Sequence, residues 1–244
     1  MMFQTYLYSD KGGRENNEDF CDYHLEECKH GVWALSDGLG GHSGGEIASE
    51  IAVESVINNF LSCSELNAEN ISSIIKTANI NICQEQKSDI HTSNMGATFA
   101  GLFTDYRNVL WAYVGDSRLY YFKKNKIIYQ TEDHSLSQLS VLKGEIKESQ
   151  IRFHEDRNIL LRALGHSENI KTGGLEKLQE IEPGDAFLIC SDGFWEYILE
   201  KEMETDLKKA TMPEMWFDLM KQRLLNKITS GNDNYSAICI MVHS

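Results

Sequence analysis

A block of strand-like segments over residues 96–130, uninterrupted by any helical pattern, constrains the fold most. Four runs in it are rich in aromatic and β-branched residues: GATFAGLFTD, NVLWAYVGD, SRLYYFKKN and KIIYQ. Turn signals such as Gly-Asp and Lys-Asn separate these runs, so the block predicts an antiparallel meander. Helical and strand patterns elsewhere also come in blocks, without strict alternation. This order favours one sheet packed on another, with helices outside.

The remaining elements follow from the spacing of apolar residues. Strands are predicted at Phe3–Ser9, Cys21–Cys28, Gly31–Ser36, Gly174–Ile181, Ala186–Cys190 and Tyr235–Val242. Apolar residues three or four apart predict helices over 47–60, 71–82 and 215–228, with Ser43 as a cap for the first. The first two helices are candidates for an antiparallel layer. Shorter helical stretches are predicted at 136–142 and 155–164.

Composition places the chain among globular proteins and disfavours some partners. The 244 residues are 41% hydrophobic and include only 2 prolines, and no linker-like run divides them, so we expect one domain over 1–244. The 37 acidic residues outnumber the 23 basic ones, and the net charge of -14 disfavours binding to nucleic acid. No apolar run approaches the ~18 residues of a membrane-spanning helix, and the N-terminus lacks a signal-peptide core. We therefore expect a cytoplasmic protein with no membrane partner.

The six cysteines show no CxxC spacing, and several lie in apolar strand-like runs such as FLIC and AICI. Buried free thiols of a reduced protein explain this pattern better than disulfides or zinc ligands.

Aspartates stand where predicted strands end. Three of them follow an apolar strand directly, in VWALSDG, LWAYVGD and FLICSDG. One Asp-Gly unit alone is most simply a turn, but three strand-end aspartates point to a shared cleft. Converging carboxylates repel one another unless cations lie between them. Carboxylate oxygens favour Mg²⁺ or Mn²⁺ over zinc.

Eight motifs run in order along the chain: RENNED (Arg14–Asp19), SDGLGGH (Ser36–His42), MGAT (Met95–Thr98), VGDSRLY (Val114–Tyr120), TEDHS (Thr131–Ser135), LLRALG (Leu160–Gly165), CSDGFWE (Cys190–Glu196) and NDNYSAI (Asn232–Ile238). Together they resemble the metal-dependent protein phosphatase family (PPM, or type 2C), in a compact bacterial form. The resemblance implies an α+β fold, a central sandwich of two antiparallel β-sheets flanked by helical layers. It also implies a flap subdomain around 135–165 beside the active site, which we expect to influence substrate choice.

The resemblance also implies a role for each motif residue. Asp37 would bridge two metal ions, Mn²⁺ or Mg²⁺, and Gly38 would lend its backbone carbonyl to one of them. Asp192 and Asp233 would bind the other ion. The implied outer ligands are Glu18 and Asp19 for metal-bound waters, and Asp116, which with Asp192 would hold a third, weaker ion. Arg14 would grip the substrate phosphate, because its planar fork suits two phosphate oxygens.

The chemistry that such a site supports can be argued without the family. Two neighbouring cations lower the pKa of a bridging water and neutralise charge on the phosphoryl oxygens of a phosphomonoester. The resulting hydroxide can displace a Ser or Thr oxygen in line, with no covalent phosphoenzyme. We assign no catalytic role to the cysteines, since none lies in a CxxxxxR sequence.

The chain departs from the family at the general acid. Eukaryotic members often carry a histidine where this chain has Leu39, and His42 and His134 are better explained as structural residues. Thr98 and Asn234 are expected to shape the loops around the metals.

Four functions are weighed. The leading one is a Ser/Thr protein phosphatase acting on phosphoproteins, opposing a Ser/Thr kinase, as a monomer. The alternatives are an inactive binding module on the same fold, a phosphatase of a small metabolite, and a calcium-binding protein. The intact set of aspartates argues against the second, and the absence of a DxDxDG loop argues against the fourth.

Overall fold

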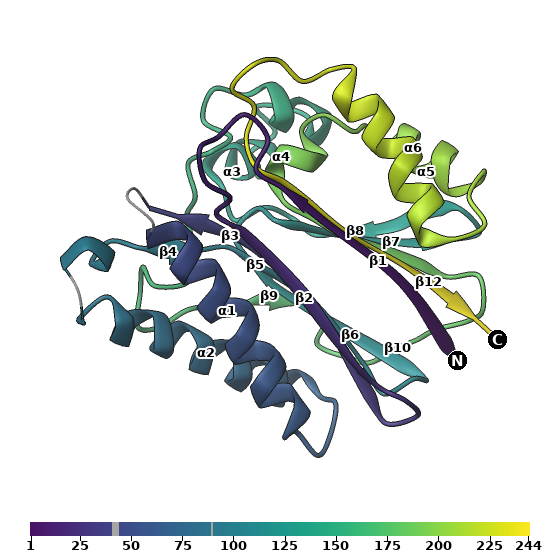
Figure 1. The fold of residues 1–244 in the computed structure, drawn as a ribbon, viewed down its shortest axis with the longest axis horizontal. Coiled ribbons are helices and arrows are strands. Elements are labelled where there is room, and N and C mark those ends of the chain that lie inside the picture. The colour runs from purple at the N-terminus through teal and green to yellow at the C-terminus, as the bar shows by residue number, and fades with distance from the viewer. Residues whose placement is uncertain (41–43, 89) are drawn as a thin grey trace.

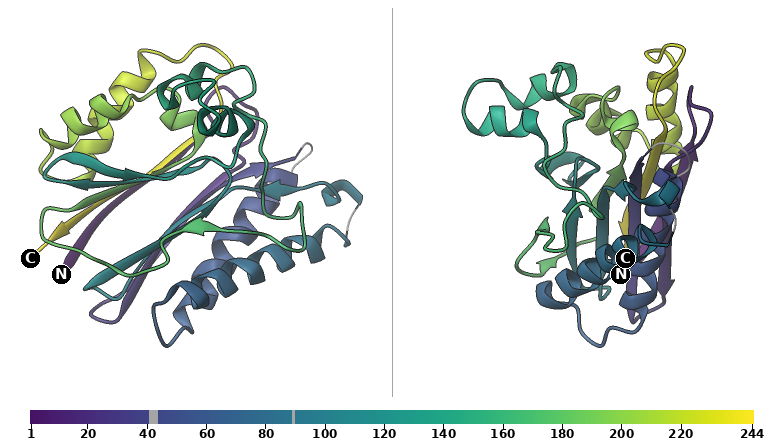
Figure 2. Two further views of the ribbon diagram at one scale, coloured as in Figure 1. Left: turned by 180° about the vertical axis from the view of Figure 1, so that it is seen from behind. Right: turned by 90° about the vertical axis from the view of Figure 1, so that its left-hand side faces the viewer.

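The computed structural model describes residues 1–40, 44–88 and 90–244. Two antiparallel sheets pack face to face, and a helical layer covers the outer face of each (Figure 1). The left view of Figure 2 shows the same order of layers from behind. The predicted α+β sandwich is therefore confirmed. Among the described residues, no helix has the length and apolar character that crossing a membrane would require.

The first sheet has five strands, and the last strand in the sequence lies in its interior. In spatial order the strands are β1 (Met2–Asp10), β12 (Tyr235–His243), β11 (Ala186–Cys190), β7 (Arg118–Lys123) and β8 (Lys126–Gln130). The predicted strands at both ends of the sequence are confirmed. They lie side by side as β1 and β12, with Met2 opposite His243.

The second sheet has seven strands. Its main path is β10 (Gln179–Glu180), β6 (Asn108–Val114), β5 (Phe99–Thr104), β3 (His30–Leu39) and β2 (Asp19–Glu26), while β4 (Gly96–Ala97) pairs with β3 and β9 (Gly173–Gly174) pairs with β6. The single strand predicted at 174–181 is thus two short strands. The predicted meander is also wrong as one unit, because β5–β6 and β7–β8 belong to different sheets. The chain crosses between the sheets at residues 115–117.

The outer layers bury the faces that the helical spacing predicts. The helices α1 (Gly44–Leu61) and α2 (Ala68–Glu85) pack on each other and on the seven-stranded sheet, and Asn67 caps α2 through its side chain. The helix α6 (Pro213–Leu225) and the unpredicted α5 (Glu200–Leu207) cover the five-stranded sheet. The third predicted helix therefore ends at 225 and not at 228. The predicted cap Ser43 lies outside the described residues.

The core between the sheets is apolar and closed. Trp33, Leu102, Trp111, Phe187 and Ile238 all lie in it. Because helices cover the outer faces as well, strands such as β5 and β11 are buried at every position. This double burial explains why their sequences are continuous apolar runs without polar alternation.

The segment over 135–165 is only partly helical. It holds α3 (Leu136–Leu142), as predicted, and the 3₁₀-helix η2 (Glu148–Phe153). The helix predicted at 155–164 does not form. Its backbone pairs instead with distant residues, Leu160 with Ser135 and Leu164 with Ala97.

All six cysteines are free, as predicted. Only Cys190 and Cys239 are buried, whereas Cys28 is exposed, so the prediction of buried thiols holds for the two in the apolar strands β11 and β12.

Candidate active site

The motif residues converge at one end of the sandwich, where both sheets contribute to a cavity of about 150 Å³. It is lined by Arg14, Glu18, Asp37, Gly38, Leu39, Asp116, Asn158, Leu160, Asp192, Asp233 and Asn234. Seven of the eight residues predicted for the site line this cavity, and Asp19 lies behind it.

Asp37 lies near the end of β3, opposite Asp19 of β2. Its N–H donates to the Thr98 hydroxyl over 2.9 Å, and its carbonyl accepts the Thr98 N–H over 2.8 Å. The next residue must be glycine, because a Cβ on Gly38 would stand 2.0 Å from the carbonyl oxygen of Gly45. The start of α1 therefore packs directly against the backbone that was predicted to bind metal.

Asp192 follows β11 and begins the short helix α4 (Asp192–Trp195). Ser191 before it donates from its hydroxyl to Asp19 Oδ2 over 2.7 Å and accepts the Ser236 N–H over 3.0 Å. This serine thus links Asp19 of one sheet to two strands of the other. Asp19 is 5% exposed, so it is held in the wall of the site by buried polar partners.

Asp233 and Asn234 precede β12 and meet the N-terminal loop. The Asn234 side-chain oxygen accepts the Glu18 N–H over 2.8 Å, and its amide donates to the carbonyls of Lys11 and Asn16. Arg14 donates to Asp233 Oδ2 over 2.8 Å with a half-exposed guanidinium. The predicted phosphate-binding arginine therefore stands at the rim, against a predicted metal ligand.

Asp116 lies in the crossover between β6 and β7. Gly115 before it has φ +96, and a Cβ there would lie 2.7 Å from Thr98 Cγ2. The Gly115 N–H donates to His134 Nδ1 over 3.2 Å, and the His134 N–H donates back to the Gly115 carbonyl over 2.9 Å. His134 thus shapes this turn, in line with the structural role expected from sequence. His42 lies outside the described residues.

The electrostatics of the cavity are those of carboxylates forced together. Burial, and then the charges of Asp19 and Asp192, raise the pKa of Asp37 well above its ordinary value. Burial, and then Glu196, raise the pKa of Asp192 to about 7. Burial raises the pKa of Asp19 to about 6 and that of Asp116 well above its ordinary value. Each carboxylate here is costly to charge without a nearby cation.

The donor set fits a hard divalent cation. The charge of Asp192 helps to raise the pKa of Asp37, so a cation between the two carboxylates would relieve their repulsion. One oxygen each of Asp19 and Asp192, both Oδ1, is buried without a hydrogen-bond partner. Within the described ranges no three His, Cys, Asp or Glu side chains are already arranged as a finished ligand set. A bound ion would therefore require the carboxylates that line this cavity to turn toward it.

Sequence reasoning missed several residues of the site. Asn158 and Leu160 form its wall from the segment after η2, where a helix was expected. Glu196, at the end of α4, influences Asp192 and is bonded by Arg157 over 2.5 Å. The motif CSDGFWE contains Glu196 and could have signalled it, whereas nothing in the sequence marks Asn158.

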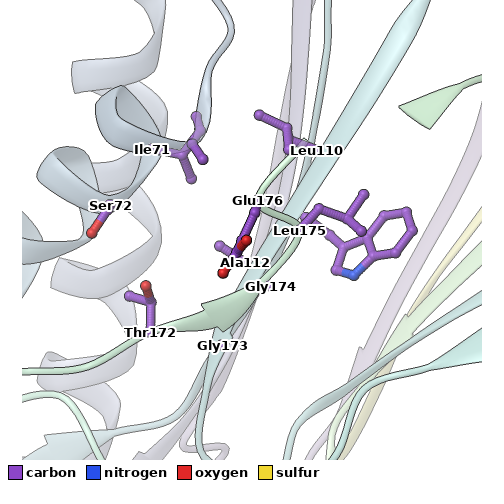
Figure 3. Close-up of a pocket in the computed structure, with 11 residues that line it drawn as sticks. Ile71, Ser72, Leu110, Ala112, Thr172, Gly173, Gly174, Leu175 and Glu176 are labelled. Atoms are coloured by element: carbon purple, nitrogen blue, oxygen red, sulfur yellow. The ribbon is translucent and has the colours of Figure 1, made fainter. Parts of the chain in front are cut away.

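A second cavity of about 330 Å³ lies between α2 and the strands β6 and β9 (Figure 3). Ile71, Ser72, Leu110, Thr172 and Glu176 are among its lining residues. None of the predicted site residues lines it, and among its lining residues only Glu176 carries a carboxylate. The chemistry therefore points to the smaller acidic cavity.

The protein phosphatase 2C family model matches residues 11–229. The serine/threonine phosphatase stp of Listeria innocua is 33% identical over 207 residues, which cover 82% of this chain and 81% of that protein.

Solved structures agree with the observed fold. Stp1 from Staphylococcus aureus, a serine/threonine phosphatase, superposes with a TM-score of 0.89 at 26% identity, covering 100% of this chain and 96% of that one. The catalytic domain of the phosphatase PstP, solved with two manganese ions, has a TM-score of 0.80 at 24% identity over 99% and 98% of the two chains; this likeness concerns the fold alone. The chain therefore belongs to the protein phosphatase 2C family and is a protein serine/threonine phosphatase.

Proposed function

We propose that this phosphatase is metal-dependent and hydrolyses phosphoserine and phosphothreonine in proteins without a covalent intermediate. The observation that carries the proposal is the convergence of buried and half-buried carboxylates from both sheets, two of them with an unpartnered oxygen, beside an exposed arginine. Burial and mutual repulsion raise the pKa of Asp37, Asp116 and Asp192, and divalent cations would relieve both effects.

The residues divide into direct and outer ligands. Asp37, the Gly38 carbonyl, Asp192 and Asp233 would hold two ions, Mn²⁺ or Mg²⁺. Glu18 and Asp19 would hold water around them, and Asp116 with Asp192 would hold a third, weaker ion. When bound, such ions lower the pKa of water and offset the charge of a phosphoryl group. The PstP domain was solved with two manganese ions, so Mn²⁺ is the ion to test first.

Arg14 binds and orients the phosphate in this proposal. Its guanidinium is 56% exposed at the rim and already hydrogen bonds to Asp233, so it stands beside the predicted ligands. Its fork can donate to two oxygens of a dianion. The described cavity lining contains no histidine, and Leu39 cannot move a proton.

The segment 135–165 is proposed as a flap that selects among substrates. Asn158 and Leu160 line the cavity, and the neighbouring Ile159 and Leu161 are about half exposed, at 49% and 53%. Ile159 and Leu161 are the sequence neighbours of two residues that line the cavity. They would favour substrates with apolar residues next to the phosphorylated residue.

The flap proposal is tested with the double variant Ile159→Ser/Leu161→Ser. We expect it to lower kcat/KM for a phosphothreonine peptide with apolar flanks, leaving p-nitrophenyl phosphate turnover unchanged. An unchanged preference between apolar-flanked and polar-flanked peptides would count against this role.

The cellular setting is proposed on the chemistry alone. Because the enzyme removes phosphate from Ser and Thr, a Ser/Thr kinase must supply its substrates. We propose that the two act in opposition in the cytoplasm, and that the phosphatase acts as a monomer.

The decisive experiment is hydrolysis of a phosphothreonine peptide and of p-nitrophenyl phosphate in Mn²⁺, Mg²⁺ or EDTA. Turnover should require metal, and Asp192→Ala should abolish it without unfolding the protein. Arg14→Ala should mainly raise KM, because it removes a phosphate contact and not the nucleophile. The control is Arg107→Ala, since Arg107 is an exposed arginine paired with Glu180 away from the cavity. Metal-independent turnover, or near-normal turnover by Asp192→Ala, would refute the proposal.

A further inference from the structure

The side chain of Trp195 connects two segments of the active site. Trp195 is the last residue of α4, the helix that begins at Asp192, and is 1% exposed. Its indole N–H donates to the backbone carbonyl of Asp116 over 2.9 Å. One buried side chain therefore joins the helix carrying Asp192 to the crossover carrying Asp116.

This bond holds Asp116, the middle residue of the crossover. The preceding Gly115 is bonded to His134, and the following Ser117 is bonded to the Thr98 hydroxyl over 2.7 Å. The carbonyl of Asp116 accepts instead from Trp195. Since Asp116 and Asp192 come from different strand ends, their separation depends on this bond as well as on the packing of the strands.

The indole ring is itself held in place. The Arg118 guanidinium lies 3.5 Å from the centre of the Trp195 ring. Arg118 donates two hydrogen bonds to Asp133, over 2.8 and 2.7 Å, and both side chains are almost fully buried. Turning the indole would disturb a desolvated ion pair, which is costly. The donor therefore has a fixed direction.

We propose that Trp195 is a positioning residue that sets the spacing of Asp116 and Asp192, and so determines the affinity of the divalent ion that they share. The inference rests on the proposed metal-dependent function. The inference goes beyond the proposed function because it assigns the geometry of the weakest ion site to the indole of Trp195. This indole is neutral and buried, and it touches neither metal nor substrate.

The test is Mn²⁺ binding to the metal-free protein, measured by calorimetry for Trp195→Phe. Phenylalanine keeps a ring beneath Arg118 and removes the indole N–H together with part of the ring volume, a loss that the matched control shares. Loss of one hydrogen bond should weaken the weakest class of Mn²⁺ site by about three- to tenfold. Activity at limiting Mn²⁺ should fall and return at saturating Mn²⁺.

The matched control is Trp216→Phe. Trp216 is equally buried, and its indole N–H donates to the carbonyl of Met203 over 3.1 Å, between α5 and α6. It should lose comparable thermal stability and bind Mn²⁺ as the wild type does. Equal Mn²⁺ affinity in the two variants would overturn the proposal.

A measurement on the wild type covers the case in which Trp195→Phe fails to fold. In a Mg²⁺ titration followed by NMR, the Trp195 indole N–H signal should shift with the midpoint of the weakest site, while the Trp216 signal stays still. A stationary Trp195 signal would refute the role. Wild-type turnover of the phosphothreonine peptide decides the proposed function separately, because it does not depend on the comparison of the two tryptophans.

Discussion

At the scale of single residues, the neutral side chain of Thr98 orders the charged site. Its hydroxyl accepts the Asp37 N–H and bonds to Ser117, and its carbonyl accepts the Ser36 hydroxyl over 2.6 Å. Thr98 thus bonds to the predicted ligand Asp37, and to Ser36 and Ser117, which lie next to Asp37 and Asp116. Thr98 is completely buried and uncharged, and its hydrogen bonds hold the backbone that carries the Asp37 carboxylate.

Replacing Thr98 by valine should cost about 1–3 kcal/mol, because the buried Asp37 N–H loses its acceptor. The free energy of unfolding in urea measures this cost, and Mn²⁺ affinity should fall as well. Thr104→Val is the control: Thr104 is also fully buried and bonds to Tyr106 and Asn108, but at the opposite end of β5. It should lose stability and keep its Mn²⁺ affinity. Unchanged Mn²⁺ affinity in Thr98→Val would contradict the role of Thr98.

His134 should make stability depend on pH. Burial, and then Arg162, lower its pKa to about 4 from the ordinary 6.5. Between these values the unfolded chain binds a proton that the folded chain does not, so stability falls as pH drops from about 6.5 to about 4. In His134→Asn the fall in unfolding free energy between pH 7 and pH 5 should be smaller. An equal fall in variant and wild type would show that His134 is not responsible.

The carboxylates of the site could be predicted from the sequence, and its wall could not. Asp37, Asp116 and Asp192 each follow an apolar run in the sequence, and this position predicts a shared cleft, whereas their separate roles come from the family resemblance. Asn158 and Leu160 lie in a segment whose apolar spacing suggests a helix. Pairing of Leu160 with Ser135 overrides that local preference, and only the folded chain contains this partner.

At the scale of elements, the crossover between β6 and β7 decides the architecture. A Gly-Asp turn can close a hairpin or pass the chain to another sheet, and the strands on either side have the same apolar character. Local pattern therefore predicted a meander here. In the structure the chain passes to the other sheet here. Gly115 has a positive φ at this point, and it lies so close to Thr98 that there is no room for a Cβ.

Gly115→Ala should lower the stability of the protein far more than Gly184→Ala does. At φ +96 an alanine costs about 1–3 kcal/mol in backbone strain, and its Cβ would also overlap Thr98. Gly184 has φ +93 with no heavy atom within 4 Å of a built Cβ, so Gly184→Ala should show the strain alone. Thermal unfolding and Mn²⁺ binding are measured for both variants, and Gly115→Ala should show the larger loss in each. Similar losses in both variants would mean that the contact with Thr98 is unimportant.

At the scale of the whole molecule, the acidic site works against the stability of the fold. Asp19, Asp37 and Asp116 come from the seven-stranded sheet or its crossover, whereas Asp192 and Asp233 come from the other sheet. Their repulsion acts across the sandwich in a protein whose net charge is already -14. A cation between them would convert this repulsion into a bond between the sheets.

Asp192→Asn should therefore change stability in opposite directions with and without metal. In EDTA it removes repulsion, and Tm should rise by roughly 2–4 °C for each kcal/mol relieved. In saturating Mn²⁺ the wild type should be the more stable protein, because the variant loses a ligand. Asp218→Asn, at an exposed position on α6, should follow the wild type in both conditions. A variant less stable than wild type in EDTA would contradict the repulsion argument.

The interior place of β12 has a consequence for biosynthesis. Every other element of the sandwich leaves the ribosome before β12, yet β12 separates β1 from β11 and is preceded directly by Asp233. A nascent chain lacking it has an open five-stranded sheet, and its Asp233 lacks the strand that holds it in place. We therefore expect no phosphatase activity before β12 has been made, and we expect truncation within β12 to yield an inactive protein.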